Sequence, residues 1–65
     1  MLPRLLTTAE VATLLNVPPA TLRWWRYKGV GPASFTLGAR RVMYRLEDVE
    51  AWLREQYENS GRGDA

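Results

Sequence analysis

The fold is decided by residues 18–29, which read PPATLRWWRYKG. This stretch carries the start and stop signals of one short helix. Pro19 suits the first helical position, because its missing N–H would have no partner there, and it also holds Pro18 extended. Gly29 can adopt the left-handed conformation that ends a helix. The sequence therefore predicts a helix of about three turns, from Pro19 to Lys28.

The side chains of this helix divide between two unlike faces. At about 100° per residue, Leu22 and Trp25 share one face, and Arg26 lies at its margin. The opposite face carries a cationic and aromatic set with two flanking residues: Ala20, Arg23, Trp24 and Tyr27, flanked by Thr21 and Lys28. Cations beside aromatic rings are typical of a surface that contacts phosphates and base edges. We therefore expect Trp25 inside and Trp24 outside, with Trp24 as a second core aromatic left open as the alternative.

Length and composition indicate one small domain. A chain of 65 residues buries only roughly 60% of its unfolded surface, so its three Trp, three Tyr and one Phe must supply much of the core. With no Cys and no His, the sequence predicts no disulfide, no metal site and no cofactor. No apolar run approaches the roughly 20 residues of a membrane span, and no signal peptide opens the chain. We expect a soluble domain in the cytoplasm.

Charge is distributed unevenly along the chain, although its net value is only +2. Between residues 11 and 45 there is no acidic residue, and the six cations are Arg23, Arg26, Lys28, Arg40, Arg41 and Arg45. From residue 46 onward, six acidic residues accompany only two arginines. A middle third without acids indicates a polyanionic partner. DNA or RNA is favoured over a membrane, since no basic helix with an apolar membrane face is present.

A first helix is predicted before the one already described. Thr7 and Glu10 have the spacing of a capping box, so we expect a helix from Thr8 to Leu15, with Asn16 as its left-handed end. Only three residues then separate the two helices. So short a connection is typical of a helix-turn-helix, whose second helix enters the DNA major groove.

A β-hairpin is predicted after the second helix. Residues 34–37 and 40–44 alternate around Gly38-Ala39, which favours a two-residue type II′ turn. That register places an apolar set on the face that packs on the helices: Phe35, Leu37, Val42 and Tyr44. Arg40 and Arg41 then lie at the tip of a projecting wing. Solubility is one role for such arginines, but the acid-free middle third favours contact with the DNA backbone or minor groove.

The last predicted element is a helix from Glu47 to Tyr57, whose acidic first turn complements the helix dipole. Its inward stripe is expected to consist of Leu46, Val49, Trp52 and Leu53. Residues 58–65 are polar and contain glycine, which predicts a disordered tail after a folded domain over residues 1–57. The predicted fold class is mostly α with a small β-hairpin: a winged helix-turn-helix in the order helix, turn, recognition helix, hairpin wing, helix.

Several motifs, taken in order, carry a family resemblance. They are Val17-Pro18, Thr21-Leu22, the run from Trp25 to Gly29, the Gly38 turn, Tyr44-Arg45 and the run from Asp48 to Leu53. This ordered set spans about residues 5–56 and resembles the small winged-helix domains of the phage excisionase group. That group belongs to the superfamily of mercury-regulator-type winged helices.

The resemblance implies a recombination directionality factor, which binds repeated sites beside a phage attachment site and bends the DNA. Such a factor helps a tyrosine integrase to excise the prophage in the bacterial host cell. In this family, positions matching Ala20, Trp24 and Tyr27 carry charged DNA-contacting side chains. Here only Arg23 keeps a charge on that face, so base preferences do not transfer. Larger relatives dimerise through a long C-terminal helix, and we expect this chain to be a nucleoid-associated monomer that associates along DNA.

The residues expected to bind double-stranded DNA are thus Ala20, Thr21, Arg23, Trp24, Tyr27, Lys28, Arg40 and Arg41. No catalytic residue is predicted, because the chain has no His or Cys and no glycine-rich phosphate loop. Two alternatives to an excisionase stay open. One is a small winged-helix transcription regulator, and the other is a protein-interaction module in which Trp24 and Tyr27 dock on a partner protein.

Overall fold

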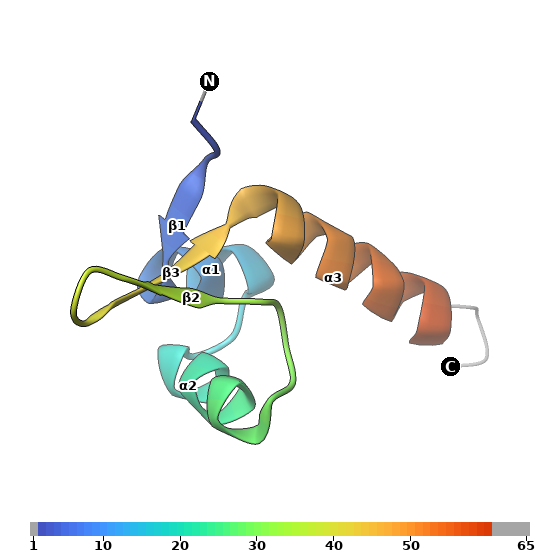
Figure 1. Ribbon diagram of the computed structural model, residues 1–65. Helices are drawn as coiled ribbons and strands as arrows, with labels where there is room; N and C mark the ends of the chain where they lie inside the picture. The colour runs from blue at the N-terminus through green and yellow to red at the C-terminus, as the bar shows by residue number, and fades with distance from the viewer. Residues whose placement is uncertain (1, 61–65) are drawn as a thin grey trace.

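The computed structural model describes residues 2–60, which form three helices and a three-stranded antiparallel sheet (Figure 1). In chain order the elements are β1 (Leu5–Thr7), α1 (Thr8–Leu15), α2 (Pro19–Lys28), β2 (Phe35–Leu37), β3 (Arg41–Arg45) and α3 (Leu46–Ser60). The β2–β3 hairpin follows the α1–α2 pair and precedes α3, as expected for the wing. This arrangement confirms the predicted winged helix-turn-helix.

Local capping signals set both ends of α1, and the predicted bounds are confirmed. The Thr7 amide donates to Glu10 Oε1 at 2.8 Å, and the Glu10 amide donates to Thr7 Oγ1 at 3.1 Å. Asn16 ends the helix in the left-handed conformation, with φ at 61°. The capping box therefore satisfies two free amides at the start of α1. Asn16 closes the last turn of the same helix.

The bounds of α2 are also as predicted. Pro18 is extended, with φ at −64° and ψ at 147°, and Pro19 occupies the first helical position. Gly29 takes a φ of 78°, and its amide donates to the carbonyl oxygens of Arg26 and Trp25 at the end of the helix. The connection from α1 is short enough that α2 packs directly against α1. The turn between the two helices is thus fixed by proline at one end and asparagine at the other.

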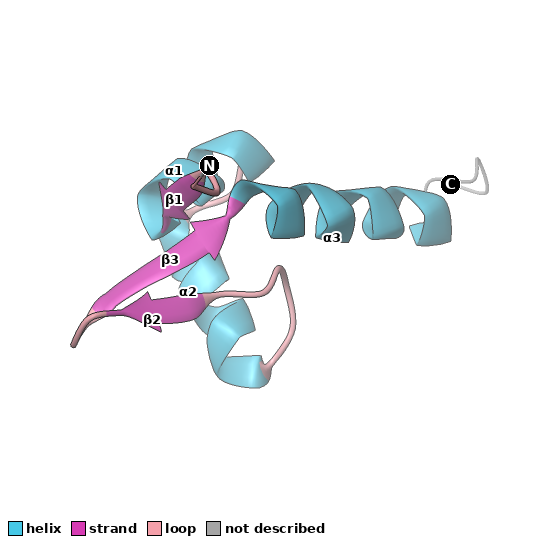
Figure 2. Ribbon diagram, turned by 45° about the horizontal axis from the view of Figure 1, so that its top comes forward, coloured by secondary structure: helices cyan, strands magenta, loops and turns pink. Residues whose placement is uncertain are grey.

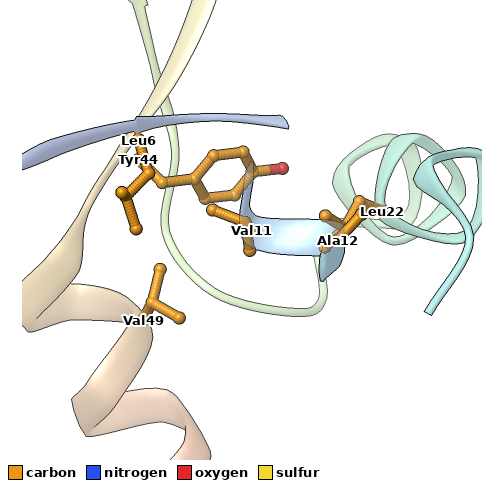
Figure 3. Packing of buried hydrophobic residues seen from close by; sticks show 6 residues of the cluster. All are labelled: Leu6, Val11, Ala12, Leu22, Tyr44 and Val49. Carbon is orange, nitrogen blue, oxygen red and sulfur yellow. The ribbon is translucent and has the colours of Figure 1, made fainter. Parts of the chain in front are cut away.

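The core joins the two helices to the sheet. It consists of Leu6 from β1, Val11 and Ala12 from α1, Leu22 from α2, Tyr44 from β3 and Val49 from α3 (Figure 3). Tyr44, Leu22 and Val11 are the largest side chains that are fully buried within the described residues. In Figure 3 the Tyr44 ring extends from β3 toward α1, and Leu22 points toward Ala12. A few side chains therefore hold α2 in place and leave its other face free.

The sheet contains a strand that the sequence did not predict. β1 pairs with β3 in antiparallel register, with Leu6 opposite Tyr44, so the strand order is β1-β3-β2. The Leu46 amide also donates to the Arg4 carbonyl oxygen at 2.9 Å, which continues this pairing beyond the strands. A strand of three residues is too short to show an alternating pattern.

The predicted register of the hairpin is wrong by one residue. Leu37 pairs with Arg41 and Phe35 with Met43, so the loop has three residues, 38–40, rather than two. Since a one-residue slip moves every side chain of a strand to the other face, Phe35 and Leu37 lie opposite the core and are 39% and 45% exposed. Val42 and Tyr44 face the core as predicted. Gly38, with φ at 69°, lets the chain turn.

The helix α3 is longer than predicted and only partly packed. It runs from Leu46 to Ser60, so residues 58–60 are helical where the sequence predicted a disordered tail. The rest of that predicted tail, residues 61–65, lies outside the described part of the chain. The second half of α3 projects beyond the other elements in Figures 1 and 2. Leu53 is therefore 50% exposed, which contradicts its predicted inward position.

A small aromatic cluster connects α2 to α3. The rings of Trp25 and Trp52 lie 5.4 Å apart between centroids and are tilted by 46°. Both side chains are half-buried, so Trp52 lies at the edge of the core rather than inside it as predicted. Gly31, with φ at 84°, packs against Trp25 so closely that an added Cβ would lie 3.1 Å from the indole. The loop after α2 thus packs against the Trp25 side chain.

Candidate nucleic-acid interface

The two predicted faces of α2 are confirmed by burial. Leu22 is 1% exposed and Trp25 is half-buried, whereas Trp24 is 57% and Tyr27 82% exposed. The adjacent tryptophans therefore point to different environments, and the alternative of Trp24 as a second core aromatic is wrong. An exposed indole beside an exposed phenol forms a contiguous apolar surface, and such surfaces mark interaction sites.

The exposed aromatic side chains form an ordered cluster on α2. The rings of Trp24 and Tyr27 stack with centroids 6.0 Å apart and an interplanar angle of 27°. Lys28 Nζ lies 5.3 Å from the centroid of the Trp24 ring, in cation–π geometry. These contacts use the i,i+3 and i,i+4 spacings that bring helix side chains together. The cluster therefore places two aromatic rings and an ammonium group side by side on the exposed face of α2.

Most cations of the acid-free middle third are free of carboxylate partners. Within residues 2–60 the single ion pair joins the Arg45 guanidinium to the Glu47 carboxylate. Arg45 is thereby neutralised at the end of β3. Between residues 11 and 45, the other five cations have no carboxylate partner: Arg23, Arg26, Lys28, Arg40 and Arg41. These five are all exposed, so their positive charge is available to an anionic partner.

The wing supplies two of these cations. Arg40 is the last residue of the hairpin loop, and Arg41 is the first residue of β3. Figures 1 and 2 show the hairpin loop and α2 at the same end of the molecule, away from the C-terminal end of α3. A duplex laid across that end would meet the second helix of the helix-turn-helix and the wing together.

The predicted site residues thus fall into two groups. Ala20, Arg23, Trp24, Tyr27 and Lys28 are exposed on α2, and Thr21 is half-buried at the edge of the same helix. Arg40 and Arg41 are exposed on the wing. Arg26 was predicted only to lie at the margin of the inward face, but it is exposed and adds a further cation to α2. Its marginal position on the helix wheel was the signal that could have identified it.

The described residues contain neither a candidate metal site nor a helix that could span a membrane. Between residues 2 and 60, no group of three or more Asp, Glu, His or Cys side chains is arranged to hold a metal ion. None of the helices in this part of the chain has both the length and the apolar character that crossing a membrane requires.

Comparison with known proteins gives the family. No curated protein and no solved structure matches the chain significantly. The family model described as a helix-turn-helix domain matches residues 5–57, which include every described element up to the last turn of α3. A helix-turn-helix domain implies DNA binding. The chain therefore belongs to the helix-turn-helix domain family, which includes excisionase-like DNA-binding domains.

Proposed function

We propose that this protein is a DNA-bending excisionase. It binds specific sites near a phage attachment site and directs a tyrosine integrase toward excision of the prophage. The observation that carries the proposal is the pairing of an ordered cation–aromatic face on α2 with a cationic wing at the same end of the molecule. The ordered motifs shared with the excisionase group supply the finer part of the proposal.

In the proposed complex, α2 lies in the major groove and α1 crosses behind it. Ala20, Thr21, Arg23, Trp24 and Tyr27 face the base edges, while Lys28 lies toward the sugar–phosphate backbone. Arg40 and Arg41 of the wing contact the backbone or the adjacent minor groove. The DNA-binding unit is residues 1–57, acting in the bacterial cytoplasm as a monomer that associates along DNA. Contacts made by both α2 and the wing on one duplex favour a bent path for the DNA.

Salt dependence tests the DNA-binding part of this proposal. Five free cations predict a slope of log affinity against log salt of roughly −4 to −5, because each neutralised phosphate contributes about −0.9. Replacing Arg40 and Arg41 together by alanine is expected to make the slope less steep by up to about two units for every sequence tested. Fluorescence anisotropy with labelled duplexes at several salt concentrations measures both slopes.

The control for the wing variant is Arg54→Ala, which removes an exposed cation from α3. It is expected to leave the slope unchanged, since α3 projects away from the proposed DNA surface. A wild-type affinity that barely responds to salt would contradict DNA binding and support the protein-interaction module instead. An unchanged slope in the Arg40→Ala, Arg41→Ala variant would remove the wing from the interface.

An excision assay tests the finer part of the proposal. A reporter flanked by the attachment sites nearest to the gene for this chain is supplied with the neighbouring integrase. Addition of the wild-type chain is expected to increase excision, and footprinting is expected to place the chain beside the attachment site. Arg23→Ala is expected to reduce both effects. Protection of a promoter with no change in excision would instead show a transcription regulator.

A further inference from the structure

We infer that α2 recognises its DNA site mainly through the methyl groups of thymines, together with one guanine contacted by Arg23. This inference rests on the proposed DNA binding and adds the kind of sequence that is bound. It follows from which side chains form the exposed stripe of α2 and from how the structure fixes them. The stripe consists of Ala20, Arg23, Trp24 and Tyr27, at the i, i+3, i+4 and i+7 spacing of one helix face.

The hydrogen-bonding side chains of α2 limit which bases this helix can recognise. Bidentate recognition of adenine uses Asn or Gln, and acceptance from the cytosine amino group uses Asp or Glu. The helix from Pro19 to Lys28 contains none of these four residue types. The bidentate contact to adenine and the carboxylate contact to cytosine are therefore not available to this helix.

Guanine is recognised by Arg or Lys. Lys28 lies over the Trp24 ring at the edge of the stripe, so its ammonium is directed to the indole rather than extended toward a base. Arg26 lies at the margin beside the buried face. Arg23 lies in the stripe itself, is exposed and has no carboxylate partner among the described residues. One arginine so placed can make a bidentate contact with one guanine.

The other residues of the stripe offer apolar groups to the major groove. Ala20 presents a methyl group, and Trp24 presents an exposed indole that is stacked on Tyr27. Thymine is the base that carries a methyl group in the major groove, and apolar side chains contact it there. The indole of Trp24 is 57% exposed, so it is accessible to such a methyl group. Thymine methyl groups are thus the features that this stripe complements.

The test starts from duplexes that the full chain selects from a random library. Each thymine of the selected site is then replaced by deoxyuridine, which removes the methyl group and keeps the base pair. Affinity is expected to fall roughly fourfold for each contacted thymine, the change expected for one buried methyl group. Equal affinity for the thymine and deoxyuridine duplexes would overturn the inference while leaving DNA binding intact. Failure to select any duplex would instead contradict the proposed function.

Protein variants separate a methyl contact from an effect on DNA shape. Trp24→Ala is expected to abolish the penalty at one thymine and Ala20→Gly at another, each with circular dichroism to confirm folding. Arg54→Ala is the control, because Arg54 is exposed on α3 outside the proposed interface, and it is expected to keep every penalty. Arg23→Ala is expected to relax the preference for guanine and leave the deoxyuridine penalties unchanged. Penalties that persist in both Trp24→Ala and Ala20→Gly would overturn the inference.

Discussion

Replacing Tyr44 by alanine is expected to remove most of the protein's stability at 25 °C. Tyr44 is 1% exposed and belongs to the core that joins β3 to all three helices. Truncating a buried aromatic residue costs about 3–5 kcal/mol, and a domain of this size has a total stability on the order of 5 kcal/mol. Urea unfolding followed by circular dichroism measures the loss.

Two matched variants make this prediction specific to the observed register. Tyr44→Phe keeps the ring in place and is expected to change the free energy of unfolding by less than about 1 kcal/mol. Phe35→Ala is expected to cost no more than about 1.5 kcal/mol, because Phe35 is 39% exposed on the other face of the sheet. The register predicted from the sequence places Phe35 and Tyr44 on the same inward face. Equal large losses for Tyr44→Ala and Phe35→Ala would therefore favour that register and contradict the structure.

The helices α1 and α2 could be predicted from the sequence because their ends are encoded locally. The Thr7–Glu10 capping box, the left-handed Asn16 and the Pro19 start each involve residues only a few positions apart. Such signals act within one turn of helix and do not depend on the rest of the fold. The two faces of α2 were predictable for the same reason, since helical periodicity alone separates Leu22 from Trp24.

The strands and the end of α3 depend on contacts that are distant in sequence. Alternation around Gly38 fits a two-residue and a three-residue loop equally well. The pairing of β3 with β1 joins residues far apart in the chain, so the local sequence pattern does not predict it. Leu53 has the spacing of an inward residue, but α3 extends past the elements that would cover it. Periodicity identifies an apolar stripe and cannot say how far a neighbouring element reaches along it.

The candidate site was predictable in composition and less so in arrangement. Charge counting along the chain identifies the cations, but it treats Arg45 like the others, whereas Glu47 neutralises it in the structure. The stack of Trp24 on Tyr27, with Lys28 over the indole, also depends on side-chain conformations that spacing permits without requiring. That cluster changes the expected chemistry of the site, because it directs Lys28 away from base contact.

The adjacent tryptophans are expected to separate folding from DNA binding. Trp25→Ala removes the contact with Trp52 and the packing on Gly31, and it is expected to lower stability by about 2–4 kcal/mol. That range is below the usual cost for tryptophan because the side chain is only half-buried. Trp24→Ala is expected to change stability by less than about 1 kcal/mol, since the indole is 57% exposed.

DNA affinity is expected to show the opposite order under conditions in which both variants are folded. Trp24→Ala should lose about 2 kcal/mol of binding free energy, or roughly thirtyfold in affinity, as expected for an aromatic residue at the centre of an interface. Trp25→Ala should bind within about threefold of wild type once the measured unfolded fraction is subtracted. Urea unfolding and anisotropy titration on the same preparations give both quantities. The reverse pattern would mean that α2 presents its Leu22 face to DNA, which is incompatible with a side chain that packs against α1 in the core.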